Sequence, residues 1–77
     1  MNTDKLIHMA NQMGDFFSAQ PDVAAAQQGL AEHLRKFWAP PMRRQLKAAI
    51  DSGQGGGLSP WVRQALSDTQ PDWVPKA

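Results

Sequence analysis

Prolines and glycines divide this chain into short segments, and their positions constrain the fold more than any other feature. Pro21 disfavours helical geometry at the residue before it, and the Pro-Pro pair at 40–41 provides a second stop. The glycine-rich stretch 53–57 is a third interruption. Ser59 followed by Pro60 is a strong helix start, because a capping hydroxyl precedes proline at the first helical position. In 77 residues, this arrangement predicts one domain of short elements.

Within these segments, apolar residues recur at intervals of three and four, the spacing of an amphipathic helix. Gly29 is costly inside the second such segment and indicates a close helix crossing. No strand pattern and no internal repeat is present. The sequence therefore predicts an all-α fold, a small bundle of three to four short helices. The expected helices begin after a cap at Asn2 or Thr3, at Asp22, at Pro41 and at Pro60.

The C-terminal residues are expected to leave the bundle. Two prolines lie within residues 70–75, a stretch that is not expected to sustain a helix. The predicted organisation is a helical domain over residues 1–68 and an extended or disordered tail over residues 69–77.

The small net charge and the lack of long apolar runs argue against nucleic-acid-binding and membrane-spanning proteins. The net charge is +1; residues 1–38 carry three basic and four acidic side chains, and residues 39–77 carry five basic and three acidic ones. A nucleic-acid-binding domain of this size usually has a larger basic excess. No apolar run approaches the ~20 residues of a membrane span, and no signal peptide is visible. A cytoplasmic protein is expected, with neither nucleic acid nor membrane as a partner.

Catalytic and metal-binding patterns are weak. The chain has no cysteine, and His8 and His33 lie in different predicted helices without ligand spacing. Ser18 and Ser59 occupy helix ends, which explains them without catalysis. The glycine-rich stretch 53–57 lacks the Gly-Lys-Ser/Thr ending of a phosphate loop and follows a helix instead of a strand. We therefore expect no catalytic residue, no metal site and no cofactor of its own.

Two aromatic pairs indicate a surface for another protein. Adjacent residues on a helix point about 100° apart, so Phe16 with Phe17, or Phe37 with Trp38, cannot both lie centrally in one small core. At least one ring of each pair is expected at the edge of the bundle, where aromatic residues are preferred interface anchors.

Polar and basic residues extend this prediction. Asn11 and Gln12 lie beside the apolar stripe of the first helix, and Arg43, Arg44 and Lys47 form a basic strip suited to carboxylates on a partner. Ordinary solvated helix surface is the alternative for both groups. The predicted partner-binding residues are Asn11, Gln12, Phe17, Phe37, Trp38, Met42, Arg43, Arg44 and Trp61.

Four blocks of sequence carry a family resemblance. They are KLIHMANQMGDFF at 5–17, HLRKFW at 33–38, PMRR at 41–44, and GGLSP at 56–60 followed by AL at 65–66. In this order and spacing they resemble the delta subunit of the bacterial NAD-dependent, molybdenum-containing formate dehydrogenase, over about residues 3–67. Such subunits commonly read Phe-Trp, a small or polar residue, then Pro-Arg-Met-Arg, whereas here Pro41 precedes Met42. If that arginine of the family contacts the partner, this chain lacks the contact, and Arg44 is its candidate replacement.

The resemblance implies a small accessory subunit, not an enzyme by itself. In that family the larger subunits hold the molybdenum cofactor, iron–sulfur clusters, flavin and NAD site and oxidise formate to carbon dioxide. The delta chain is associated with assembly or stability of that complex. Phe17, Trp38, Arg43 and Arg44 are then expected to face the large catalytic subunit. Trp38→Ala with Arg43→Glu is expected to release the chain while leaving it helical.

Other functions remain open at this stage. A small nucleic-acid-binding module would place Arg43, Arg44 and Lys47 on phosphates, although Met42 and Leu46 occupy one face of that helix. A free homodimer would bury the edge aromatics, so a homo-oligomer is possible for the isolated chain. A transient assembly chaperone and a permanent subunit are equally compatible with the sequence.

Overall fold

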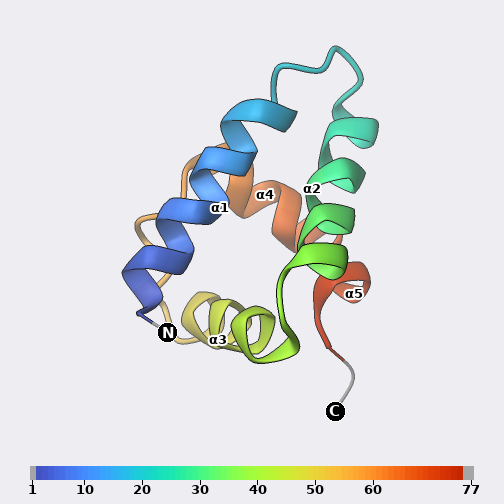
Figure 1. Cartoon of the computed structure of the whole chain (residues 1–77). Coiled ribbons are helices and arrows are strands. Elements are labelled where there is room, and N and C mark those ends of the chain that lie inside the picture. Colours follow the sequence, from blue (N-terminus) through green and yellow to red (C-terminus); the bar gives the residue numbers. More distant parts are fainter. Residues whose placement is uncertain (1, 76–77) are drawn as a thin grey trace.

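The computed structural model describes residues 2–75 of the chain. These residues form five helices joined by turns and loops, and they contain no strand (Figure 1). The all-α prediction is therefore confirmed. The helices are α1 (Thr3–Phe17), α2 (Val23–Phe37), α3 (Pro40–Asp51), α4 (Pro60–Asp68) and α5 (Gln70–Trp73). None of these helices is long and apolar enough to cross a bilayer.

Local capping explains where the longer helices begin. Asn2 Oδ1 accepts a hydrogen bond from the backbone N–H of Asp4 at 2.7 Å, so Asn2 is the cap of α1. Asp22 and Ser59 cap α2 and α4 in the same way. α3 begins one residue earlier than predicted, because Ala39 is extended and both prolines fit the first turn.

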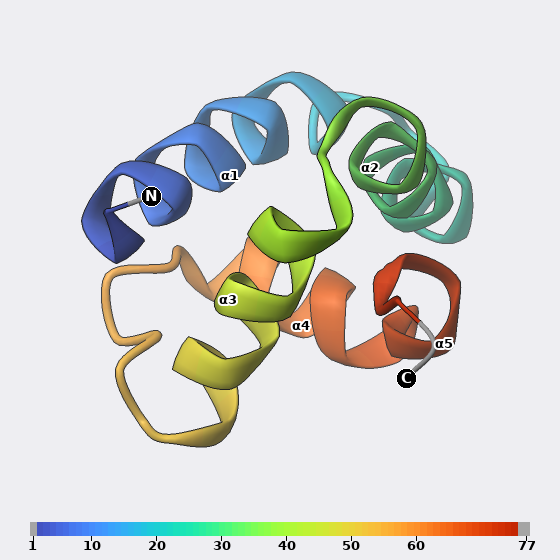
Figure 2. The same cartoon turned by 60° about the horizontal axis from the view of Figure 1, so that its bottom comes forward.

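α1 and α2 form an antiparallel pair, and the other helices pack against one end and one face of this pair. α4 crosses behind the pair, and α3 lies across its lower end (Figure 1). Seen from that end, α3 stands in front of α4, and α5 lies beside α2 (Figure 2). α2 contacts α1, α4 and α5, and α1 contacts α2, α3 and α4.

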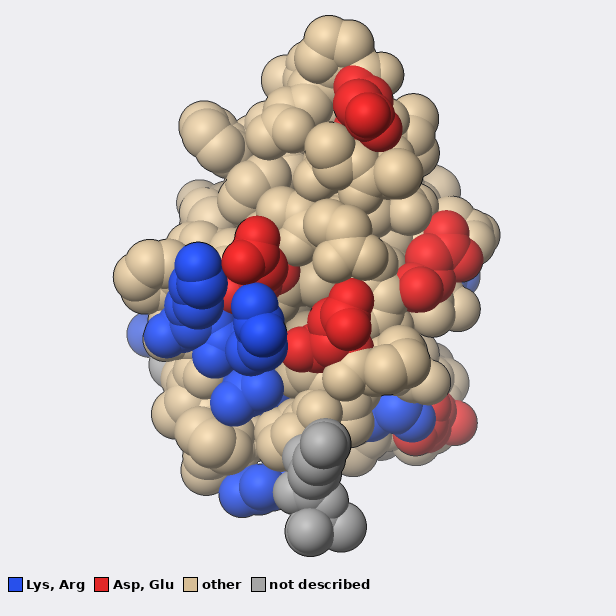
Figure 3. Space-filling view, turned by 90° about the vertical axis from the view of Figure 1, so that its right-hand side faces the viewer, with Lys and Arg blue, Asp and Glu red and all other residues tan. Residues whose placement is uncertain are grey.

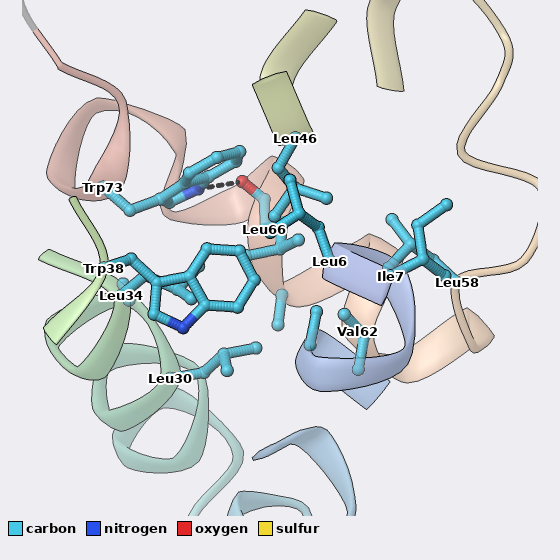
Figure 4. Packing of buried hydrophobic residues seen from close by; sticks show 13 residues of the cluster. Leu6, Ile7, Leu30, Leu34, Trp38, Leu46, Leu58, Val62, Leu66 and Trp73 are labelled. Atoms are coloured by element: carbon cyan, nitrogen blue, oxygen red, sulfur yellow. Dashed lines mark hydrogen bonds between the residues drawn. The ribbon is translucent and has the colours of Figure 1, made fainter. Parts of the chain in front are cut away.

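The core lies where these helices meet. Its largest fully buried side chains come from all five helices, and they point into one cluster (Figure 4). Burying each such side chain contributes about 1.5–3 kcal/mol. They are Leu6, Leu30, Leu34, Leu46, Val62, Leu66 and Trp73.

Gly14 allows α1 and α4 to approach closely. A Cβ built at this position would lie 2.1 Å from Val62 Cγ2. Non-bonded carbon atoms do not approach this closely, so a side chain here would force Val62 or α4 itself to shift.

The prediction of an extended tail is wrong for residues 70–73. These residues form α5, and the Trp73 side chain is completely buried. Its Nε1 donates a hydrogen bond to the carbonyl oxygen of Leu66 at 2.9 Å (Figure 4). Pro71 does not prevent this helix, because it occupies the first turn, where the backbone N–H has no helical partner. The helical domain therefore continues past residue 68; residues 76–77 of the predicted tail lie outside the described part.

Candidate protein interface

Trp38 does not face outward as predicted. Only 5% of the residue is exposed, and its ring lies in the core beside Leu34 (Figure 4). Phe37 is the edge ring of this pair, at 73% exposure. The helical angle between neighbours does not apply here, because α2 ends at Phe37 and Trp38 is already extended, with φ −92° and ψ 133°.

Arg43 has an intramolecular role. Its Nε donates to the carbonyl oxygen of Trp38 and its Nη1 to that of Trp73, both at 3.2 Å. These carbonyls lie at the C-terminal ends of α2 and α5, where backbone oxygens lack helical partners and carry partial negative charge. The guanidinium therefore ties two helix ends together. Trp38→Ala with Arg43→Glu would remove a buried ring and both of these hydrogen bonds, so the double variant is expected to lose stability and does not test an interface alone.

Asn11 is also committed within the chain. Its Nδ2 donates to the carbonyl oxygen of Gly57, and its Oδ1 accepts from the N–H of Ser59, both at 2.9 Å. The amide thus fixes the loop between α3 and α4 against α1. Its neighbour Gln12 is exposed.

The three residues of the predicted basic strip do not share one exposed surface. Arg43 binds the two carbonyls, and Lys47 pairs with Asp51 one turn along α3. Arg44 is exposed. Phosphate contacts by Arg43 and Lys47, as the nucleic-acid alternative requires, would break these internal contacts.

Met42 and Trp61 are intermediate in their exposure to solvent. Each is partly buried and packs against the core. Trp61 also lies near Gly14, where α1 and α4 cross. Part of each side chain is therefore accessible, and the rest contributes to the fold.

Four rings form a continuous cluster across α1 and α2. Phe16 and Phe17 meet edge to face, with centroids 5.1 Å apart; Phe17 lies 6.2 Å from His33, and His33 lies 4.9 Å from Phe37. We call Phe16, Phe17, His33 and Phe37 the aromatic cluster. Phe16 is 69% exposed and Phe37 is 73% exposed, so the cluster is open to solvent at both ends.

The backbone of α2 contacts the Phe17 ring in the middle of the aromatic cluster. Gly29 faces the Phe17 ring, and a Cβ built at Gly29 would lie 2.8 Å from two of its carbons. His33 and Phe37 follow at intervals of four on α2 and therefore share one face of the helix. The close crossing predicted at Gly29 is thus a contact between Phe17 and the α2 backbone. His33 was not among the predicted partner-binding residues, although its four-residue spacing to Phe37 is visible in the sequence.

Charged side chains border the cluster on α2. Glu32 pairs with Arg35 at 3.3 Å and with Lys36 at 3.4 Å, so one carboxylate faces two cations. All three side chains are more than half exposed, and such pairs contribute little to stability. On the face formed by α2 and α5, Lys and Arg gather toward one side, and Asp and Glu are spread across the rest (Figure 3). The α2 border carries a local excess of one positive charge.

The glycine-rich loop forms an open hollow with Ile50 and Arg63. Arg63 Nη2 donates to the carbonyl oxygen of Gly55 at 3.3 Å, which directs its charge toward the protein's own backbone. Gly53 has φ 81° and follows the C-cap Ser52, the position at which glycine commonly stops a helix. Within residues 2–75, no three His, Asp or Glu side chains converge in a way that could hold a metal ion.

Comparison with known proteins identifies the family. The model of the NADH-dependent formate dehydrogenase delta subunit, FdsD, matches residues 5–66. Neither curated proteins nor solved structures gave a significant match. The matched span includes the aromatic cluster, Trp38, Arg43 and the Asn11 contact with the loop. The chain therefore belongs to the family of NADH-dependent formate dehydrogenase delta subunits.

Proposed function

We propose that this chain is a non-catalytic subunit that binds the larger subunits of a formate dehydrogenase and supports their assembly or stability. The family match over residues 5–66 carries this proposal. The larger subunits would bind the molybdenum cofactor, iron–sulfur clusters, flavin and NAD and oxidise formate, and this chain would have no cofactor of its own. We place the complex in the cytoplasm.

The exposed aromatic residues support a role in binding. Phe16 and Phe37 remain mostly in water in the isolated chain, at 69% and 73% exposure. Aromatic residues are enriched in the buried centres of protein interfaces, where they gain most from leaving water. Binding to the folded chain would also stabilise its small core by mass action.

A co-purification experiment tests this function. The tagged chain is recovered from its native cell grown on formate, the bound proteins are identified, and formate:NAD activity is assayed in the eluate. Larger subunits in fixed ratio, with activity, are the expected result for a permanent subunit. Larger subunits recovered only in inactive, cofactor-poor form would instead indicate an assembly chaperone. Their absence would contradict the proposal.

A further inference from the structure

We propose that Pro71 is a conformational device that prevents the exchange of α5 between two copies of this chain. By separating α5 from α4, it directs Trp73 into the core of its own copy. When residue 71 can continue a helix, α4 and α5 merge, and the space that Trp73 leaves is filled by Trp73 of a second copy. This inference concerns the isolated chain and is independent of the proposed function.

A single residue, Thr69, separates the two helices. α4 ends at Asp68 and α5 begins at Gln70. Thr69 has φ −111° and ψ 16°, whereas an α-helix has values of about −63° and −42°. Its N–H still donates to the carbonyl oxygen of Ala65 at 3.1 Å, the bond that a continuing helix would make. The change of direction is therefore confined to one residue, and a rotation there would align α5 with α4.

Pro71 opposes that rotation. In a continuous helix its nitrogen would face the carbonyl oxygen of Ser67, to which it has no hydrogen to donate and with which its ring would clash. In the observed fold Pro71 lies in the first turn of α5, where a proline is tolerated. The indole Nε1 of Trp73 then donates to the carbonyl oxygen of Leu66 at 2.9 Å (Figure 4). In a continuous helix that oxygen would instead accept from the N–H of Gln70.

A merged helix would empty part of the core. Trp73 would lie about 10 Å beyond Leu66 along the helix axis, at 1.5 Å per residue, so its indole could no longer reach the Leu66 carbonyl of its own copy. In the observed fold 0% of Trp73 is exposed, and α5 packs against both α2 and α4. An unfilled space of this size and an indole in water would both destabilise the opened chain.

A second copy is the occupant that the fold itself identifies. Each opened copy offers one space and one Trp73 side chain that fits it, and an exchange about a two-fold axis fills both. The exchanged pair would also restore the hydrogen bond from Arg43 to the carbonyl oxygen of Trp73, now between copies. The proline clash arises in each of the two merged helices, so Pro71 leaves the closed monomer favoured.

The test compares the self-association of the wild-type chain with that of Pro71→Ala by sedimentation equilibrium. The association constant is expected to rise at least about a hundredfold, because the substitution removes a proline penalty from two helices per dimer. Pro60→Ala is the matched control. Pro60 lies in the first turn of α4, where its replacement removes no clash, so self-association is expected to stay unchanged.

An isotope-filtered NOE experiment identifies the contact that joins the copies. A mixture of isotope-labelled and unlabelled Pro71→Ala chains is expected to show NOEs between Trp73 of one copy and Leu66 of the other. The same mixture of wild-type chains is expected to show this contact only within each copy, because α5 stays on its own chain.

The outcomes decide the inference whatever larger subunits the chain binds. A Pro71→Ala chain that stays monomeric at the concentrations used for NMR would overturn it. A dimer without the NOE between copies would also overturn it, because that dimer would use another face. Pro71→Gln is made in parallel and is expected to behave as Pro71→Ala does. Loss of helicity in both variants would show that Pro71 is needed for the closed fold itself, against the role proposed.

Discussion

Two aromatic regions of this molecule have opposite surroundings. At one end, Trp38 and Trp73 are buried, and Arg43 binds the backbone carbonyls of both. We call these three residues the Trp–Arg junction. In the aromatic cluster, Phe16 and Phe37 project into water. Aromatic content alone therefore does not distinguish core from surface; what differs is whether hydrophobic side chains of other helices cover the ring.

Trp73→Ala is expected to have the largest effect on stability. Truncating a buried tryptophan costs about 3–5 kcal/mol, and a chain of this size has a total stability of only about 4–12 kcal/mol. Urea denaturation followed by circular dichroism measures the change. Phe37→Ala is the control in the other region and is expected to cost under about 0.5 kcal/mol. Equal losses would refute the contrast between the two regions.

Arg43→Met is expected to destabilise the chain by about 2–4 kcal/mol. The variant keeps much of the apolar stem and removes two hydrogen bonds from a charged donor, each worth about 1.5–3 kcal/mol before the structure relaxes. Arg44→Met on the same helix is the control, since that side chain is exposed. If both variants denature at the same urea concentration, Arg43 does not tie α2 to α5.

Asn11→Ala is expected to cost about 1–2 kcal/mol, because it leaves the Gly57 carbonyl and the Ser59 N–H without the amide. Amide hydrogen exchange should rise at Ser59 and nearby loop residues more than in α2. Gln12→Ala, one residue along on the exposed side of α1, serves as the control. Unchanged exchange in the loop would show that other contacts fix it.

Phe16→Ser with Phe37→Ser is expected to have the smallest effect on stability, under about 1 kcal/mol, since neither side chain belongs to the core. Thermal unfolding of the isolated chain measures it. A loss of several kcal/mol would mean that Phe16 and Phe37 are part of the packing that holds the fold.

Local sequence was sufficient for most helix ends. Asn2, Asp22 and Ser59 cap their own helices within a few residues, so the signals lie next to the structures that they determine. α5 could not be predicted in this way. A four-residue helix with Pro71 has little intrinsic stability, and it forms because α2 and α4 bury Trp73.

The interface residues were harder to predict, because their contacts are distant in sequence. Asn11 binds a carbonyl 46 residues away, and Arg43 binds one 30 residues away. Neither partner was visible from local pattern, so both side chains were assigned to an external protein. The argument from paired aromatics did predict one edge ring in each pair. It did not identify Phe37 over Trp38, because that choice depends on the residue at which α2 ends.

Site-specific photo-crosslinking of the assembled complex tests the central claim most directly. Benzoylphenylalanine replaces Phe37 in one preparation and Arg44 in another, and the crosslinked larger subunit is identified by mass spectrometry. The account predicts efficient crosslinking from position 37 to a larger subunit, with little from position 44. Crosslinking from position 44 alone would contradict it and assign the interface to α3.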